Sequence, residues 1–360
     1  MKNVNILTNK FNSPNGIAFL FPLIHFRKKF FESGIRLNFF TNIKDKRLLD
    51  CDYFIIDYRF LYGQFNKNFD ILLDFLKNNK QNYDKIIFYD NTDSTGTLSD
   101  QVLDHVDIYL KNQILKDSSL YLKKYYGARI YTDFYNKRYE VTDKQNFYQK
   151  PITVKNIKKI RVGWNSGLCE YSVFSAYKQS LIKNFSLPET LNFFKFVTNI
   201  TKPSNERLNL VSCRIGSDYP RPTVAYQRQQ INKLLKGLKK TKKVSRLQYF
   251  RELKNSRVVV SPFGWGEISL RDFEVFLTGG LLYKPKMNHL KTWPDFFEED
   301  VTIKCFDWDL KNFERNLEEI ISNFSNYLSI ALNAQERYLK YTSDKGSFDL
   351  FLKHFKSTLA

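Results

Sequence analysis

Short apolar runs alternate with amphipathic stretches along the first part of the chain, as in strands followed by helices. The apolar runs predict strands over residues 4–7, 36–40, 53–56 and 85–89. Amphipathic stretches predict a helix over residues 17–32, stopped by Gly34, and another over residues 69–77. This β-α-β rhythm predicts an α/β fold with a mostly parallel sheet and helices on both of its faces.

The pattern becomes polar and irregular over residues 131–155, and a second β-α-β series follows. It predicts strands over residues 160–164, 208–213, 258–261, 281–284 and 301–306, and helices over residues 226–238, 270–278 and 313–339. A chain of 360 residues exceeds one comfortable core, so two domains are expected. We place an N-terminal domain at residues 1–150 and a C-terminal domain at residues 151–340. Residues 341–360 should form a helical segment that packs back toward the first domain.

The strongest chemical signal directly follows the apolar run at residues 258–261. Gly264 and Gly266 allow the backbone to approach a ligand closely. Ser269 and Asp272 have the spacing of a capping box, so a helix should begin there. A strand, a glycine turn and a helix N-terminus form an anion site, because free N–H groups and the helix dipole favour phosphate. In an open α/β sheet, ligands bind at this carboxyl edge.

Charged side chains after the glycine turn suggest separate roles in binding. Glu274, in the first turns of the helix, can accept hydrogen bonds from a ribose diol, and Glu267 would face sugar hydroxyls. Arg271 would neutralise a diphosphate or pair with a carboxylate. The alternative is an ordinary turn with a charged, solvent-facing helix start. The concentration of Gly, Glu and Arg after a buried strand favours the ligand site.

This segment resembles a known motif. The string Gly264-Trp265-Gly266-Glu267, followed by Arg271-Asp272-Phe273-Glu274, is similar to the C-terminal donor-site motif of exostosin-like glycosyltransferases and, more widely, to the nucleotide-sugar domain of GT-B enzymes. The resemblance covers residues 249–285. It implies two Rossmann-like domains facing a cleft, closed by C-terminal helices, with Glu274 on the donor ribose. It also implies that Gly264, Gly266 and Glu267 lie against the diphosphate and sugar. Trp265 is a further donor-binding candidate, and Glu267 is also a catalytic candidate. Retaining GT-B enzymes often separate the two glutamates by one more residue, so the stereochemistry stays open.

Two further turns are candidates for the donor site. The turn containing Asn165 and Gly167 would form the other wall of the donor pocket, as the GT-B resemblance implies, although many α/β turns carry such residues. Arg214 follows the strand that ends at Cys213 and can hold a diphosphate through charge-assisted bonds. Such neutralisation is the main electrostatic demand when a nucleoside diphosphate leaves without a metal. Arg228 is interpreted as a solvated or structural helix residue.

Asp90 and Asp93 follow the predicted strand at residues 85–89. A carboxylate at this edge can serve as general base for an attacking sugar hydroxyl. Their spacing also resembles metal-ligand motifs, but no His or third acid supports a metal. Asx residues after a strand commonly make turns or cap the next helix, and this remains the alternative for both.

The formal charge of +20 predicts an anionic partner. Nucleic acid, an anionic membrane face and phosphorylated small molecules all satisfy it. The densest basic run is interpreted as a solvated helix end and loop, or as a membrane-attracting segment: Lys233, Lys236, Lys239, Lys240, Lys242, Lys243 and Arg246. The four Cys and four His have no metal-site or disulfide spacing. No secretion signal is recognised, so a cytoplasmic protein is expected, at the inner face of the cytoplasmic membrane.

These observations favour a metal-independent glycosyltransferase. It would move a sugar from a UDP- or GDP-sugar to a hydroxyl of a glycan or lipid-linked glycan, in surface polysaccharide or glycoconjugate synthesis. One alternative is a nucleic-acid-binding protein, although no recognised motif supports it. Another is a polyol-phosphate transferase on the same frame. A dinucleotide-dependent oxidoreductase is disfavoured because no G-x-G-x-x-G follows the first strand.

Overall fold

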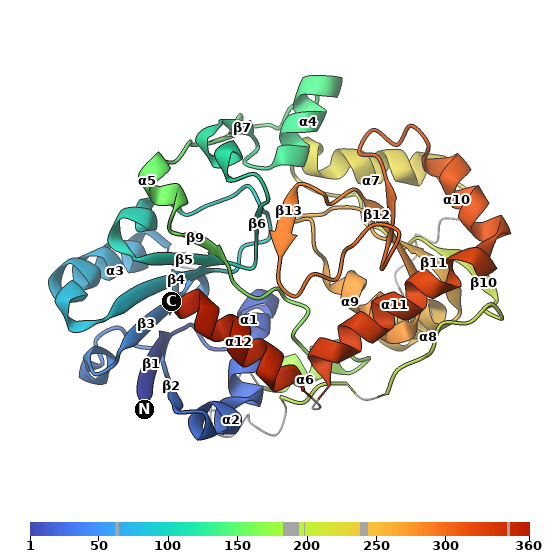
Figure 1. Ribbon diagram of the computed structural model, residues 1–360. Helices are drawn as coiled ribbons and strands as arrows, with labels where there is room; N and C mark the ends of the chain where they lie inside the picture. The colour runs from blue at the N-terminus through green and yellow to red at the C-terminus, as the bar shows by residue number, and fades with distance from the viewer. Residues whose placement is uncertain (62–64, 183–193, 198, 238–243, 344–345) are drawn as a thin grey trace.

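The computed structural model describes residues 1–61, 65–182, 194–197, 199–237, 244–343 and 346–360. It has two lobes, each built on a parallel sheet, which lie side by side in Figure 1. The predicted α/β class with two Rossmann-like lobes and C-terminal helices is confirmed. No helix in these ranges is long and apolar enough to cross a membrane.

The first sheet has the strand order β2-β1-β3-β4-β5-β9. Its strands are β1 (Lys2–Leu7), β2 (Ile35–Phe40), β3 (Tyr53–Asp57), β4 (Lys85–Asp90), β5 (Ile108–Lys111) and β9 (Ile160–Val162). The order reverses between β1 and β3, and the carboxyl edge beside such a switch point is where open α/β sheets bind ligands. Strands buried on both faces by helices explain the continuous apolar runs seen in the sequence.

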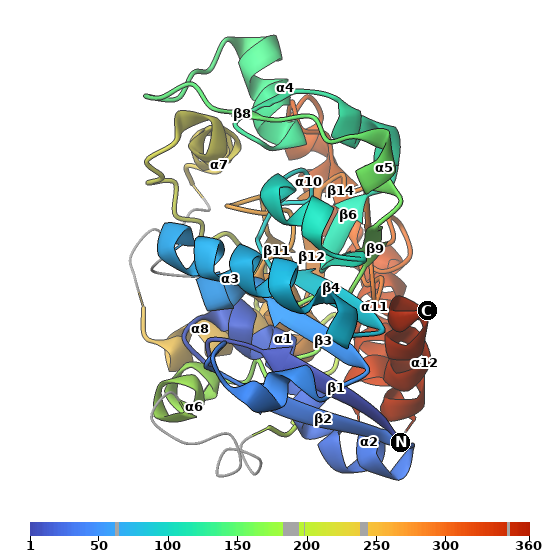
Figure 2. The same ribbon diagram turned by 90° about the vertical axis from the view of Figure 1, so that its left-hand side faces the viewer.

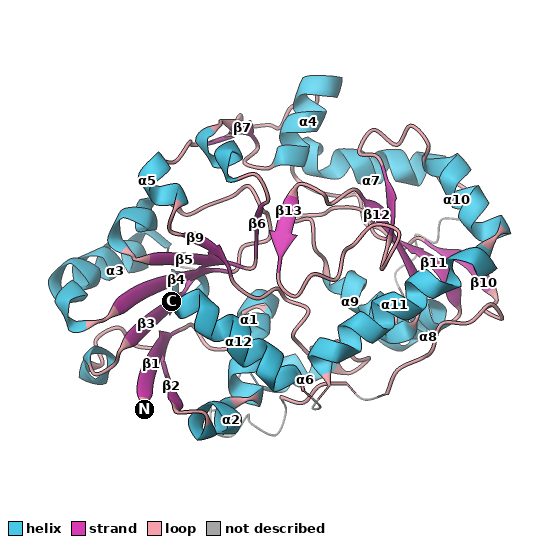
Figure 3. Ribbon diagram, viewed as in Figure 1, coloured by secondary structure: helices cyan, strands magenta, loops and turns pink. Residues whose placement is uncertain are grey.

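Helices α1 (Pro14–His25), α2 (Arg27–Glu32) and α3 (Phe65–Asn79) belong to this lobe (Figures 2 and 3). The single helix expected over residues 17–32 is two helices that meet at Phe26. The first begins earlier than expected because Ser13 caps it, with its Oγ accepting from the N–H of Gly16 at 3.0 Å.

The second sheet has the order β10-β11-β12-β14. Its strands are β10 (Asn209–Ser212), β11 (Ser256–Val260), β12 (Leu281–Pro285) and β14 (Lys304–Phe306). The helices of this part are α6 (Ser175–Ile182), α7 (Pro222–Leu234), α8 (Arg246–Lys254), α9 (Leu270–Thr278), α10 (Phe313–Ser322) and α11 (Phe324–Thr342). The predicted strand, glycine turn and helix at residues 258–278 are present, and α9 begins after Ser269 as expected.

Strand β9 corrects one expectation. It was predicted to open the second sheet, but it pairs with β5 as the last strand of the first sheet. This pairing is not evident from the sequence because residues 112–159, here called the excursion, lie between the two strands. The excursion contains β6 (Gln113–Leu115), β7 (Tyr125–Tyr126), α4 (Ile130–Tyr139), β8 (Tyr148–Gln149) and α5 (Val154–Ile157). The second sheet therefore starts at β10, well after residue 151.

The same excursion joins the lobes. Strand β6 pairs with β13 (Leu290–Thr292), and the two lie between the lobes in Figure 1. Helix α4 occupies a stretch expected to be irregular, and it packs on α7 of the second lobe. Its sequence looks polar because its buried side chains include tyrosines, whose hydroxyl groups form hydrogen bonds to the second lobe. Tyr131 donates to the carbonyl of Gly264 at 2.7 Å, and Tyr135 accepts from Gln227 at 2.7 Å.

Helix α12 (Ser347–Leu359) brings the end of the chain onto the first lobe (Figure 1). Phe351 and Phe355 pack against the buried Trp164, and Phe355 also contacts Phe30 of α2. The Nε2 atom of His354 lies 2.9 Å from the carbonyl oxygen of Gly163. One hydrophobic cluster thus contains residues from both lobes and from this helix.

Candidate functional site

The turn at Gly264–Gly266 lies where the two lobes touch. A Cβ atom on Gly266 would fall 1.9 Å from the carbonyl oxygen of Asp93, so only glycine permits this approach. The carbonyl of Trp265 accepts from Arg129 at 2.8 Å, and the guanidinium of Arg129 also lies over the indole ring. The turn expected to meet a ligand is therefore held at the junction by residues of the first lobe.

Glu267 is fully buried in this junction. Its Oε2 accepts from the N–H of Thr95 and from Nε2 of Gln113, both at 3.1 Å, so it links the lobes. Its Oε1 lies 3.5 Å from Nε2 of His289. Burial alone would raise the pKa of Glu267, but His289 and the N–H of Thr95 lower it. In this structure Glu267 contacts protein groups at the position where a sugar-facing role was expected.

Glu274 lies on α9 and is 5% exposed. Its Oε1 is 2.9 Å from Nη2 of Arg246, at the start of α8. Burial raises the pKa of Glu274, and the guanidinium groups of Arg246 and Arg271 offset part of this rise. The carboxylate faces a cationic protein environment and not bulk water. Arg246 therefore occupies one oxygen of the carboxylate to which a ribose was expected to bind.

Arginine side chains gather at this edge of the second sheet. Arg271 donates to the carbonyl of Arg214 at 2.5 Å and to the hydroxyl of Tyr249 at 3.3 Å. Arg214 forms an ion pair with Glu252, with an N···O distance of 2.7 Å. Together with Arg246, these arginines place positive charge beside the N-terminus of α9. That arrangement suits an anionic ligand.

Arg228 has a structural role, in line with its sequence interpretation. It is buried, and its guanidinium donates to the carbonyls of Phe263, Gly216 and Pro262 at 2.5, 3.0 and 3.3 Å. These bonds fix the start of the glycine turn against the loop after β10. Beneath the same turn, Asp272 pairs with Lys284 at 2.9 Å, with both side chains fully buried.

Asn165 and Gly167 lie in the connection that follows β9. The side-chain amide of Asn165 donates to Oγ1 of Thr292 at 3.0 Å and to the carbonyl of Pro294 at 2.6 Å. A Cβ on Gly167 would fall 2.7 Å from the ring of Phe273, which precedes Glu274. The turn therefore touches α9, but Asn165 is buried and occupied by protein partners.

The two aspartates after β4 have different environments. Asp90 is fully buried, and its Oδ2 is 2.9 Å from Nζ of Lys111 and 2.6 Å from the hydroxyl of Tyr109. Burial would raise the pKa of Asp90, but Lys111 lowers it. These contacts leave Asp90 without access to an acceptor. Asp93 is exposed, and its Oδ1 accepts from Asn15 at 2.7 Å, so it alone of the pair can meet a substrate.

The sequence interpretation did not include Asp57 or His289. Asp57 ends β3 at the switch point, where it accepts from Oγ1 of Thr8 at 2.7 Å and from Nδ2 of Asn91 at 2.9 Å. Burial raises the pKa of Asp57 to about 6. An acid at the end of an apolar run was the signal used for Asp90, and it would have found Asp57. No comparable pattern marks His289.

Within the described ranges, no group of three His, Cys, Asp or Glu could hold a metal ion. The four cysteines are free thiols, and three of them are buried: Cys169, Cys213 and Cys305.

No protein-family model matches the sequence, and no curated protein matches it either. Several solved structures are similar in overall arrangement. HepE of Anabaena in complex with UDP-glucose has 11% identity and a TM-score of 0.44, covering 99% of this chain and 100% of that one. A glycosyltransferase of Rickettsia africae ESF-5 has 10% identity and a TM-score of 0.44, covering 99% and 98%. Sucrose-phosphate synthase of Thermosynechococcus elongatus has 9% identity and a TM-score of 0.46, covering 100% and 99%. These similarities concern the arrangement of the elements only.

Proposed function

We propose that this chain is a glycosyltransferase of the GT-B type. It would transfer a sugar from a UDP- or GDP-sugar to a hydroxyl group of a glycan or lipid-linked glycan, without a metal ion. The observation that carries the proposal is the sequence of β11, glycine turn and α9, with a buried glutamate on the helix, directly at the contact between two parallel-sheet lobes. The exostosin-like string from Gly264 to Glu274 adds to it.

Three arginines support a site for the donor diphosphate. Arg271 lies in the first turn of α9, where the helix dipole also favours negative charge, and it donates to the carbonyl of Arg214. Arg246 pairs with Glu274 in the next turn of the helix. We propose that the donor exchanges these partners: the ribose hydroxyls bind Glu274, and Arg246, whose side chain is 31% exposed, turns to the diphosphate.

The proposed reaction is a displacement at the anomeric carbon. The acceptor oxygen forms a bond to that carbon while the bond from the carbon to the diphosphate oxygen breaks. The acceptor hydroxyl gives its proton to a carboxylate, for which the exposed Asp93 is the candidate. The nucleoside diphosphate leaves with its new negative charge stabilised by Arg271 and Arg214. Asp93 touches Gly266 across the junction, so base and donor turn are adjacent.

Binding of nucleoside diphosphates tests this proposal directly. UDP or GDP at about a hundred times its dissociation constant should stabilise the fold by roughly 2.7 kcal/mol, seen as a higher melting temperature. Glu274→Gln should weaken that binding, while Glu314→Gln on the exposed side of α10 should not. If neither nucleotide shifts the melting temperature, the proposed function is wrong. If UDP and GDP bind to Glu274→Gln as tightly as to the unmodified chain, the assignment of Glu274 as the ribose partner is wrong.

A further inference from the structure

The structure has two open grooves, one beside α2 and one beside the segment that leads into α6. Helices α2 and α6 lie at the lower end of the molecule in both ribbon views (Figures 1 and 2). The first, here called the α2 groove, has a volume of about 520 Å³. It runs along α2 and the edge strand β2. Its lining combines apolar and basic side chains: Ile24, His25, Arg27, Lys28, Phe31, Arg36, Leu37 and Asn38.

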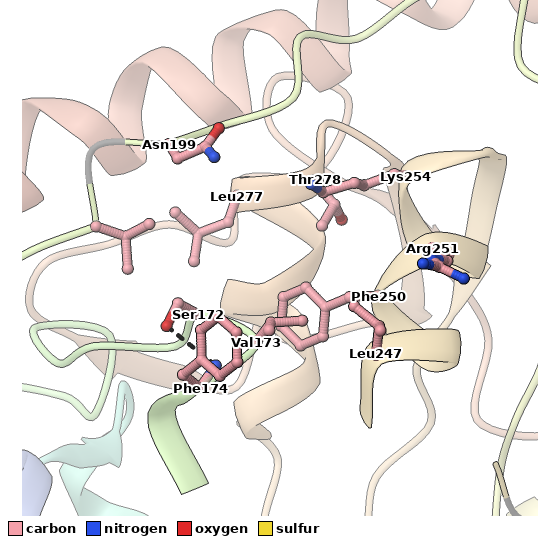
Figure 4. Close-up of a pocket in the computed structure, with 11 residues that line it drawn as sticks. Ser172, Val173, Phe174, Asn199, Leu247, Phe250, Arg251, Lys254, Leu277 and Thr278 are labelled. Atoms are coloured by element: carbon pink, nitrogen blue, oxygen red, sulfur yellow. Dashed lines mark hydrogen bonds between the residues drawn. The ribbon is translucent and has the colours of Figure 1, made fainter. Parts of the chain in front are cut away.

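The second, here called the α8 groove, has a volume of about 340 Å³ and lies between α8, α9 and the start of α6 (Figure 4). Phe174, Leu247 and Phe250 supply apolar walls. Arg251 and Lys254 of α8 supply its charge, and both side chains are exposed.

One segment of the chain connects the two grooves. The carbonyl of Phe194 lies 2.6 Å from Nδ1 of His25, and the ring of Phe196 packs on His25 with centroids 4.6 Å apart. Val197 and Asn199 then line the α8 groove. This segment therefore links the surfaces of the two grooves, one on each lobe.

This surface is cationic and unusually apolar for an exposed region. Five of the residues that line the grooves are Arg or Lys, and none of the described lining residues is acidic: Arg27, Lys28, Arg36, Arg251 and Lys254. The nearest acid on α2 is Glu32, which lies 3.9 Å from Nζ of Lys28. Large apolar side chains stand out on the same surface, with Phe174 64%, Phe31 50% and Leu247 50% exposed.

We propose that the α2 and α8 grooves together form a docking face for an anionic phospholipid bilayer. The cations pair with lipid phosphates, and Phe31, Phe174 and Leu247 enter the boundary between headgroups and acyl chains. Charge complementarity identifies the occupant as anionic, because each Lys or Arg near such a surface attracts it independently. The aliphatic and aromatic groove walls fit acyl chains. The α8 groove adjoins the Glu274 site, because Ser172 and Val173 in its lining accept from Arg246 and Phe250 lies under the Arg246 guanidinium. Binding to vesicles does not depend on sugar transfer, so the two proposals are tested separately.

Among the described members of the basic run, Lys233, Lys236 and Arg246 line neither groove. Lys239, Lys240, Lys242 and Lys243 lie outside the described residues. Arg246, the last member of the run, pairs with Glu274 and donates to the carbonyls of Ser172 and Val173. The cations of the docking face come from two short stretches, residues 27–36 and residues 251–254.

Vesicle co-sedimentation of the full chain tests the proposal. The protein should bind vesicles of phosphatidylglycerol and phosphatidylcholine in equal parts, should not bind pure phosphatidylcholine, and should dissociate as salt is raised. The double variant Arg27→Glu, Arg36→Glu should bind the anionic vesicles at least about tenfold more weakly. The control Lys311→Glu, Arg315→Glu, at the start of the distant α10, makes the same change in net charge and should bind as the unmodified chain does.

A second variant tests the apolar part. Leu247→Ser, Phe174→Ser should lose binding at high salt more than at low salt, because only the hydrophobic contribution is removed. Unchanged melting temperatures for all variants show that folding is not the cause. The proposal is overturned if the α10 control loses as much binding as the α2 double variant. It is also overturned if single-stranded RNA, but no vesicle, binds the chain in an Arg27- and Arg36-dependent way.

Discussion

Gly266 of the second lobe lies directly against the backbone of Asp93 in the first, with no room for a Cβ atom between them. Gly266→Ala should therefore separate this junction and lower the free energy of unfolding by about 1–3 kcal/mol, the usual cost of overpacking. Chemical denaturation measures the change. Gly216→Ala is the matched control, because a Cβ there would meet nothing within 4 Å. If Gly266→Ala proved as stable as the control, the contact would be contradicted.

Substitution of Asp90 and Asp93 separates structural from catalytic roles. Asp90→Asn leaves Lys111 buried without its counter-charge and should cost about 3–5 kcal/mol of stability. Asp93→Asn changes an exposed side chain and should leave stability nearly unchanged, while lowering kcat for sugar transfer by about 100-fold or more. Denaturation curves and donor turnover are measured on both variants. Full turnover by Asp93→Asn would remove it as the base.

Asp57 should give the protein a pH-dependent stability. The pKa of Asp57 is about 6 in the folded protein and about 3.9 in an unfolded chain. At a pH between these two pKa values, the folded state therefore binds the proton more tightly than the unfolded state does. The free energy of unfolding should therefore fall as pH rises through this window, by up to about 3 kcal/mol. Asp57→Asn should remove that decrease. Asp74→Asn, on the exposed side of α3, should keep it. Urea denaturation from about pH 4 to pH 7 gives the measurement, and parallel curves for both variants would contradict the assignment.

Arg271 should contribute to the binding of phosphate more than to that of the nucleoside. Arg271→Gln removes the cation beside the start of α9 and should weaken UDP or GDP binding by about 10- to 100-fold, as expected for a charge-assisted hydrogen bond. The affinity for uridine or guanosine should change little. Titration calorimetry compares each nucleotide with its nucleoside, and Arg315→Gln on α10 serves as the control. An equal loss of affinity for the nucleotide and for its nucleoside would indicate a general disturbance of the pocket.

Local signals in the sequence were sufficient to predict the segment from β11 to α9. Strand β11, its glycines and the start of α9 were all predicted, because a buried strand, a tight turn and a capping pair each leave a mark within a few residues. Strand β9 was assigned to the wrong sheet, because its pairing with β5 depends on contacts across the intervening excursion. Helix α4 was missed because its tyrosines bond to the other lobe and give it no amphipathic pattern.

The hydrogen-bond and ion-pair partners of the candidate residues could not be predicted from the sequence. Glu274 and Glu267 were recognised by their position after the strand. That Arg246 would pair with the first, and Thr95 and Gln113 with the second, follows from how distant segments meet. Asp90 and Asp93 look alike in sequence. Lys111, on the neighbouring strand β5, is what makes the first of them structural.

Helix α12 has a practical consequence for dissecting the molecule. The first lobe is completed by β9, which follows the excursion, and by a helix from the end of the chain that covers Phe30 and Trp164. A fragment cut at residue 150 would lack β9, Trp164 and α12, and would expose Phe30 to water. Independent expression of the first lobe therefore requires a fusion of residues 1–164 to α12 through a designed linker, and a simple truncation should aggregate.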